Sequence, residues 1–181
     1  MWYPATTTVA PTDEPVTVVE AKRRLRILSD DDDDDLAAFI ASARDHVEKY
    51  CNIRLTTQTV VSKCDDFSDL ARMPDAPLQS VTSISYVATD GTDTTLPTTV
   101  YEARADGLEV SVGLKYGQTW PARQPGSRIT VTSVVGFAEV PASIKHAILV
   151  FIGEHYEIRE NAKAMDWTAF DSLLANYRRG A

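Results

Sequence analysis

The sequence contains few cysteines and no long apolar run. Its 181 residues include two cysteines, Cys51 and Cys64. They do not form the disulfide framework of a small secreted protein, and their spacing lacks the paired thiols and histidines of a zinc site. We therefore expect reduced thiols, as in the cytoplasm. No stretch approaches the roughly 20 apolar residues that cross a bilayer, and the start at Met1 lacks the pattern of a secretory signal, so neither a membrane span nor a signal is predicted.

Positive charge is also scarce. The chain has 18 Lys and Arg against 26 Asp and Glu, a formal net charge of −8 and a pI of about 4.8. A protein that grips nucleic acid by its phosphates needs clustered Lys and Arg, so sequence-specific DNA binding is disfavoured. An acidic wall would instead suit DNA that slides past without sticking, because like charges repel.

The motifs of common enzymes are missing. There is no Gly-rich phosphate loop, no G-x-S-x-G and no H-E-x-x-H. The histidines are His46, His146 and His155, and the last two lie nine residues apart on one predicted helix. That spacing is about two and a half turns, too far to share a metal ion. We therefore predict no enzymatic activity, no cofactor and no metal.

The N-terminal third predicts an arm and two helices. Residues 1–16, rich in Thr and Pro, are interpreted as an extended arm, with a disordered terminus as the alternative. Thr17 and Glu20 have the spacing of a capping box, which predicts a helix to about Leu28. Its basic residues, Lys22 to Arg26, are interpreted as a solvated face rather than a nucleic-acid patch.

Six consecutive aspartates, Asp30 to Asp35, follow this helix. Negative charge before a helix start is favourable, so we interpret the run as a solvated cap. A calcium loop is the alternative, but an EF-hand needs alternating ligands, a central glycine and a terminal glutamate. The second helix is predicted to run to about Asn52, because apolar residues recur at three- and four-residue spacing. These are Leu36, Phe39, Ile40, Ala43, Val47 and Tyr50.

The middle of the chain changes to a period of two from about Leu55. Asp90-Gly91 is a strong hairpin signal, and alternating apolar residues continue to Gly136. About five or six short strands joined by turns predict a small antiparallel sheet or partial barrel.

Two helices are predicted after the strands. Pro141 marks the start of the first, whose centre is apolar almost all round and is therefore expected to be buried. The second spans about Trp167 to Arg178. The predicted fold class is α+β: a helical body of residues 17–54 and 138–181, with an inserted antiparallel β subdomain of residues 55–137.

Several stretches in this order resemble the phage head–tail connector (adaptor) proteins, which also occur in prophages and gene transfer agents. The resemblance covers roughly residues 16–160. The stretches are Thr17-Val18-Val19-Glu20-Ala21-Lys22-Arg23-Arg24-Leu25-Arg26; Ile40-x-x-Ala43-Arg44-x-x-Val47-Glu48-x-Tyr50; Met73-Pro74-x-x-Pro77-Leu78-x-Ser80-Val81-x-x-Ile84-x-Tyr86; Trp120-Pro121; Val131-Thr132-x-Val134-x-Gly136-Phe137; Val140-Pro141-x-x-Ile144-Lys145-x-Ala147-Ile148; and His155-Tyr156-Glu157-x-Arg159-Glu160.

The resemblance implies a non-catalytic structural protein of the virion. It implies a ring, commonly of twelve subunits, that contacts the portal protein on one side and a tail-side stopper or completion protein on the other, with genomic DNA passing through the bore. Assembly would take place in the cytoplasm of a bacterial host. It also implies helices from both chain ends packed together, with a β segment between them.

We hypothesise that the C-terminal segment docks on the portal, because aromatic residues and arginines suit an interface anchor. The residues concerned are Trp167, Phe170, Tyr177, Arg178 and Arg179. Three alternatives remain. The chain could be another tail-completion or minor virion protein, a DNA-binding regulator that uses the Lys22 to Arg26 helix, or an enzyme with an unrecognised site.

Overall fold

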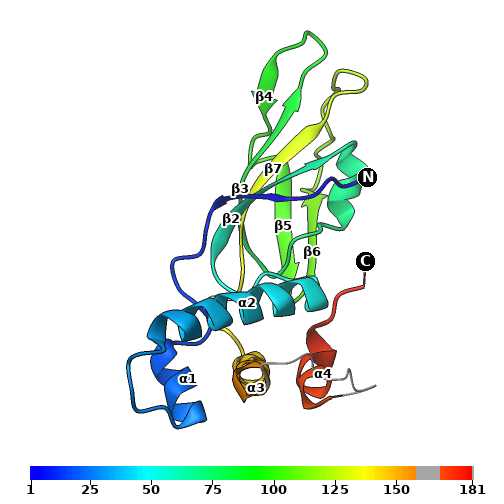
Figure 1. The fold of residues 1–181 in the computed structure, drawn as a ribbon. Coiled ribbons are helices and arrows are strands. Elements are labelled where there is room, and N and C mark those ends of the chain that lie inside the picture. Colours follow the sequence, from blue (N-terminus) through cyan, green and yellow to red (C-terminus); the bar gives the residue numbers. More distant parts are fainter. Residues whose placement is uncertain (158–167, 181) are drawn as a thin grey trace. The chain divides into compact units, whose positions relative to one another are not determined.

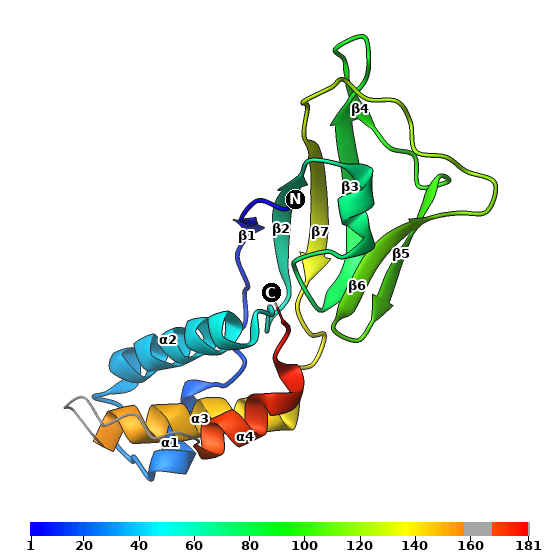
Figure 2. The same ribbon diagram turned by 90° about the vertical axis from the view of Figure 1, so that its right-hand side faces the viewer.

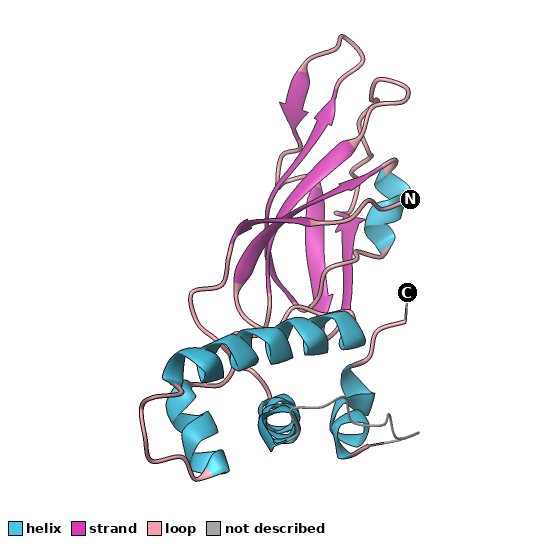
Figure 3. Ribbon diagram, in the orientation of Figure 1, coloured by secondary structure: helices cyan, strands magenta, loops and turns pink. Residues whose placement is uncertain are grey.

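The computed structural model describes residues 1–157 and 168–180. The chain forms two compact units: a β unit of Met1–Pro11 and Thr57–Ala138, and a helical unit of Thr12–Thr56 and Glu139–Ala181. In the described residues the strands belong to the β unit and the α-helices to the helical unit, while a short 3-10 helix lies among the strands (Figure 3). The predicted α+β class is confirmed.

The β unit contains an antiparallel five-stranded sheet of order β1-β2-β7-β3-β4 and a two-stranded sheet, β5-β6 (Figure 1). β7 lies at the centre of the five-stranded sheet, where its backbone pairs with β2 on one side and with β3 on the other. The strands are β1 (Thr6–Val9), β2 (Gln58–Cys64), β3 (Leu78–Val87), β4 (Asp93–Thr95), β5 (Tyr101–Asp106), β6 (Glu109–Leu114) and β7 (Ile129–Val135).

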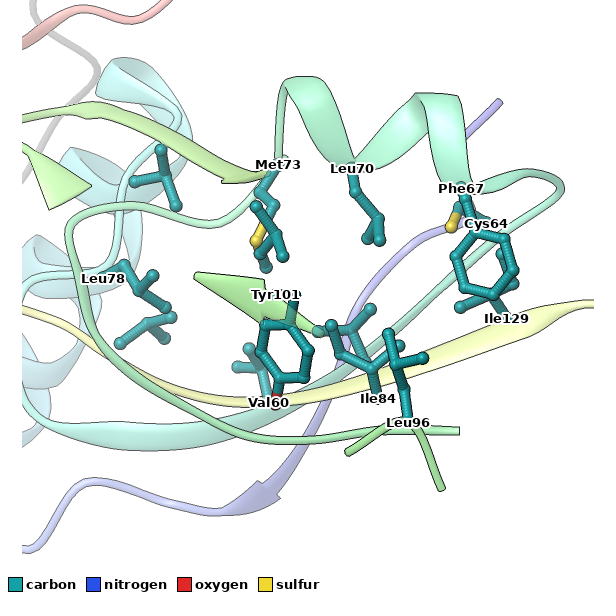
Figure 4. Packing of buried hydrophobic residues seen from close by; sticks show 14 of the residues in the cluster. Val60, Cys64, Phe67, Leu70, Met73, Leu78, Ile84, Leu96, Tyr101 and Ile129 are labelled. Carbon is teal, nitrogen blue, oxygen red and sulfur yellow. The ribbon is translucent and has the colours of Figure 1, made fainter. Parts of the chain in front are cut away.

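The core of this unit lies on one face of the sheet. Alternate residues of β2 and β7 are buried, as a half-covered strand requires. The 3-10 helix η1 (Phe67–Ala71) brings Phe67 and Leu70 onto them, as Figure 4 shows. Ile84 of β3 and Tyr101 of β5 complete this packing.

The predicted N-terminal arm is extended but is not separate from the sheet. Thr6–Val9 forms β1, the edge strand beside β2. Nearer the terminus, Trp2 makes a β-bridge with Cys64, and its indole Nε1 donates to the carbonyl oxygens of Asp69 at 3.1 Å and Arg72 at 2.8 Å. Residues 1–11 therefore belong to the β unit.

The helical unit contains α1 (Val18–Leu25), α2 (Asp33–Cys51), α3 (Ala142–Glu157), α4 (Ala169–Leu174) and the 3-10 helix η2 (Ala175–Tyr177). α3 packs against α1, α2 and α4 (Figure 2). Its core joins the apolar stripes of α2 and α3. The fully buried side chains on these stripes are Leu36, Ile40, Ala43, Val47, Ile144, Ala147, Ile148 and Ile152.

Helix boundaries differ from the predicted ones where capping decides them. The Thr17–Glu20 capping box is present, but α1 ends at Leu25 because Arg26 adopts a left-handed conformation with φ of 59°. α2 begins at Asp33, so Asp33, Asp34 and Asp35, half of the aspartate run, are inside the helix rather than before it. The last helix begins after the cap Thr168 rather than at residue 167.

Candidate partner interface

The predicted interface residues have different environments. Phe170 is buried, with 8% of its surface exposed. Tyr177 and Arg179 are half-buried and Arg178 is exposed. Trp167 lies outside the described residues. Of the four predicted anchors that the structure describes, Phe170 lies in the core of the helical unit and Arg178 is exposed.

Phe170 is held in an aromatic cluster that the sequence did not predict, formed by His46, Tyr50, Phe151, His155 and Phe170. Its ring centroid lies 5.5 Å from that of His46 and 5.6 Å from that of Tyr50, both on α2. Phe151 of α3 stacks on His46 at 5.0 Å and on His155 at 3.9 Å. Ring pairs of this kind contribute about 0.5–1.5 kcal/mol each beyond area burial. The cluster therefore attaches α4 to α2 and α3.

Asp171 links the start of α4 to α2. Thr168 caps α4, and its hydroxyl and backbone N–H both donate to the Asp171 carboxylate. The phenol of Tyr50 on α2 donates to the other carboxylate oxygen. These hydrogen bonds, that of the Thr168 hydroxyl first, lower the pKa of Asp171 to about 2. The bond to Asp171 also raises the pKa of Tyr50.

Residues 177–179, at the end of η2 and just after it, also contact α2 and α3. The backbone N–H of Arg179 donates to the carbonyl oxygen of Cys51 at 2.9 Å. The Arg178 guanidinium lies 4.6 Å from the centroid of the Tyr50 ring, a cation–π distance. Ser143 of α3 donates to the Tyr177 hydroxyl at 3.1 Å. Arg178 is thus held at a defined place while its side chain stays exposed, which suits contact with a partner.

The aspartate run is partly paired within the helical unit. Lys22 of α1 forms ion pairs with Asp30 and with Asp33, the latter at 2.7 Å. Tyr156 of α3 donates to Asp32 at 2.8 Å. The hydrogen bond from Lys22 lowers the pKa of Asp30. Part of the run therefore joins α1 and α3 to the start of α2.

The two cysteines and the possible metal ligands were considered as sources of chemistry in the described residues 1–157 and 168–180. Burial raises the pKa values of Cys51 and Cys64 to about 11, so both thiols are protonated at neutral pH. In the part of the chain that the structure describes, no three His, Cys, Asp or Glu side chains are grouped to hold a metal ion. None of the helices in residues 1–157 and 168–180 is long and apolar enough to span a membrane.

The sequence contained one signal for the aromatic cluster. His46 and Tyr50 stand four residues apart, so they lie on the same face of a helix. Their partners Phe151 and Phe170 come from more than 100 residues further along the chain, and no local pattern pairs them.

Residues 15–93 match a family model described as "Phage gp6-like head-tail connector protein". This span contains α1, α2, β2 and β3. The resemblance inferred from the sequence is thereby confirmed. No curated protein matches the chain.

The fold is shared with solved neck proteins of gene transfer agent (GTA) particles. A chain in "Neck of empty GTA particle computed with C6 symmetry" superposes with a TM-score of 0.82 at 18% identity, covering 99% of this chain and 97% of that one. Chains in "Virion of native gene transfer agent (GTA) particle" and "Neck of native GTA particle computed with C12 symmetry" give TM-scores of 0.79 and 0.77 at 19% identity, with the same coverage. At this identity the likeness establishes the fold.

Proposed function

We propose that this chain is a structural connector protein in the neck of a tailed phage or phage-derived particle, where it joins head to tail. The observation that carries the proposal is the fold likeness to GTA neck proteins over 99% of the chain, with a TM-score of 0.82. The connector family matched by residues 15–93 independently points to the same position in a particle. The role is mechanical, with no catalytic step, and its location is the virion after assembly in a bacterial host.

A ring is the form that this role requires. The titles of two neighbouring structures state C6 and C12 symmetry. In a closed ring each subunit presents two different surfaces to its neighbours, and the rotation between them closes the assembly. We propose that this chain forms such a ring, with DNA in the bore. A net charge of −8 supports this, because an acidic wall repels the phosphates of passing DNA.

The C-terminal segment is proposed to contact the portal protein, and another surface to contact the tail-side completion protein. Arg178 is the described residue best placed for the portal contact, since it is exposed and fixed above Tyr50. Arginine is enriched among residues that dominate binding energy. Phe170, which is buried, would act by holding the segment in place rather than by touching the portal.

Charge reversal of the exposed arginine tests the portal contact. Arg178→Glu should reduce the number of heads joined to tails, counted by electron microscopy of particles produced with the variant. Lys63→Glu, an exposed charge on β2, is the matched control and should leave joining unchanged. Deleting residues 165–181 is a less specific test, because it removes the buried Phe170 and Leu174.

Two results would contradict these proposals separately. Normal joining with Arg178→Glu, at normal protein levels and melting temperature, would reject the portal contact alone. Absence of the protein from the neck of purified particles, by electron microscopy with a specific antibody, would reject the connector role itself.

A further inference from the structure

The corner between α1 and α2 carries exposed charges of both signs that do not pair with each other. Arg23, Arg24 and Arg26 are exposed, and none forms an ion pair with a described residue. Asp34 and Asp35, in the first turn of α2, are also exposed and unpaired within the described chain. This arrangement contrasts with Lys22, which pairs with two aspartates of the same run.

Helix geometry indicates where Arg24 and Asp34 point. Lys22 faces the aspartate run, since it bonds Asp30 and Asp33. Arg24 follows two residues later and is rotated by about 200° around the helix, so it faces away from the run. In α2, Asp34 precedes the buried Leu36 by two residues and by the same rotation of about 200° points away from the core. Arg24 therefore points away from the aspartate run, and Asp34 points away from the core of the helical unit, so both charges are open to solvent.

Exposed aliphatic side chains accompany these charges. Leu28, in the loop between the helices, is 98% exposed and Val19 on α1 is 64% exposed. Val19 and Arg23 are four residues apart and share one face of α1. Exposed aliphatic residues beside unpaired charges of both signs suit a contact that is completed by another molecule.

We propose that this corner is a contact between neighbouring copies of the chain, with Arg23, Arg24 and Arg26 of one copy against Asp34 and Asp35 of the next. Leu28 is covered in the contact. The occupant is a second copy because the chain itself carries both complementary sets of exposed charges, so one copy can supply the partner of the next. Nucleic acid is the weaker candidate, because the aspartate run beside the arginines would repel phosphates. The proposal rests on the ring-forming function proposed above.

Charge reversal with rescue tests the contact. Sedimentation velocity at low salt measures association of the purified full chain. The double variants Arg23→Glu/Arg24→Glu and Asp34→Lys/Asp35→Lys should each weaken self-association by roughly tenfold or more, because like charges then face each other. Combining all four substitutions in one chain, or mixing the two double variants, should restore association. Added salt should weaken association of the wild type, since the charges are exposed.

The control variant carries its charge changes on the β unit instead of at the corner. Lys63→Glu/Lys115→Glu makes the same charge change on the β unit and should leave association unaltered. A wild type that stays monomeric at low salt, or an absence of rescue in the combined variant, would overturn the contact. Tight, salt-dependent binding of duplex DNA that the arginine reversal abolishes, without any effect on self-association, would also overturn it. The presence of the wild type in particle necks is measured separately, so the connector role can be rejected or supported independently of this contact.

Discussion

At the residue scale, Asp171 shows how one carboxylate organises the C-terminal segment. It completes the capping box of α4 with Thr168 and accepts a hydrogen bond from Tyr50 of α2. These bonds need the ionised form, which is why the pKa of Asp171 is lowered from 3.8 to about 2. The group therefore links local capping to tertiary attachment.

Acid should weaken this link in a defined pH range. Because the pKa of Asp171 is lower in the folded state than in the unfolded state, its contribution is complete above about pH 4 and is lost as pH falls towards 2. Asp171→Asn should reduce the free energy of unfolding at pH 7 by about 1 kcal/mol, because it weakens the hydrogen bonds that the carboxylate accepts from Thr168 and Tyr50. It should also flatten the pH dependence between 4 and 2, measured by urea unfolding. Asp93→Asn on β4 is the control, and equal pH profiles for wild type and Asp171→Asn would contradict the assignment.

The two cysteines should be unreactive in the folded protein. Burial raises both pKa values to about 11, which leaves almost no thiolate at pH 8, and both side chains are inaccessible. A disulfide reagent such as Ellman's should therefore react slowly with the native chain and fast with Cys51 and Cys64 after denaturation. Rapid release of thionitrobenzoate from the native protein would disprove this.

At the element scale, α4 has six residues and cannot be stable alone. Its sequence supplies a cap and an amphipathic pattern, but its stability comes from packing on α2 and α3. Phe170 and Leu174 are its buried residues. The exposed part of the segment, including Arg178, is positioned only because these two side chains are held.

Truncating the aromatic anchor should therefore release α4. Phe170→Ala should lower the free energy of unfolding by about 3 kcal/mol, in the range for buried phenylalanines. Phe170→Leu keeps most of the buried volume and should lose clearly less. Urea unfolding gives both values, and equal losses for the two variants would show that burial of this ring is not what holds the helix.

The aspartate run, Asp30 to Asp35, has no buried residue, in contrast to α4. Replacing Asp30 to Asp35 with Asn should leave the fold intact, because the run contributes ion pairs to Lys22 and accepts a hydrogen bond from Tyr156 but supplies no core residue. Circular dichroism should be unchanged and the melting temperature only slightly lower. Loss of the cooperative transition would show that these contacts are essential for folding.

At the scale of the whole molecule, the chain passes between its two units three times, near residues 11, 56 and 138. The helical unit therefore needs both halves of the chain, whereas the β unit is mostly one continuous segment with the arm added. Each unit has its own buried core. A substitution in one core should consequently destabilise that unit more than the other.

Hydrogen exchange can test this separation. Leu70→Ala removes a fully buried side chain beneath the sheet and should destabilise the β unit by about 2–5 kcal/mol. Amide exchange should accelerate in β2, β3 and β7 more than in α2 and α3. Equal acceleration in both units would mean that they unfold as one.

The sequence by itself determined the local structure of individual helices and strands. The Thr17 capping box, the apolar stripe of α2 and the alternation of β7 follow from residues a few positions apart, so a pattern is enough to predict them. The same patterns predicted the α+β class. The choice of the C-terminal aromatic residues and arginines as interface residues came from their residue types and stays a prediction.

Only the tertiary structure decided which of those residues are available to a partner. Phe170 is buried because His46 and Tyr50 on α2 and Phe151 on α3 surround it, and Asp171 meets Tyr50 across 121 residues of sequence. The pairing of Thr6–Val9 with β2 also joins distant segments, since Thr6 lies opposite Val61. The physical reason is that burial and pairing depend on contacts between distant segments, and periodicity within one segment carries no information about its neighbour in space.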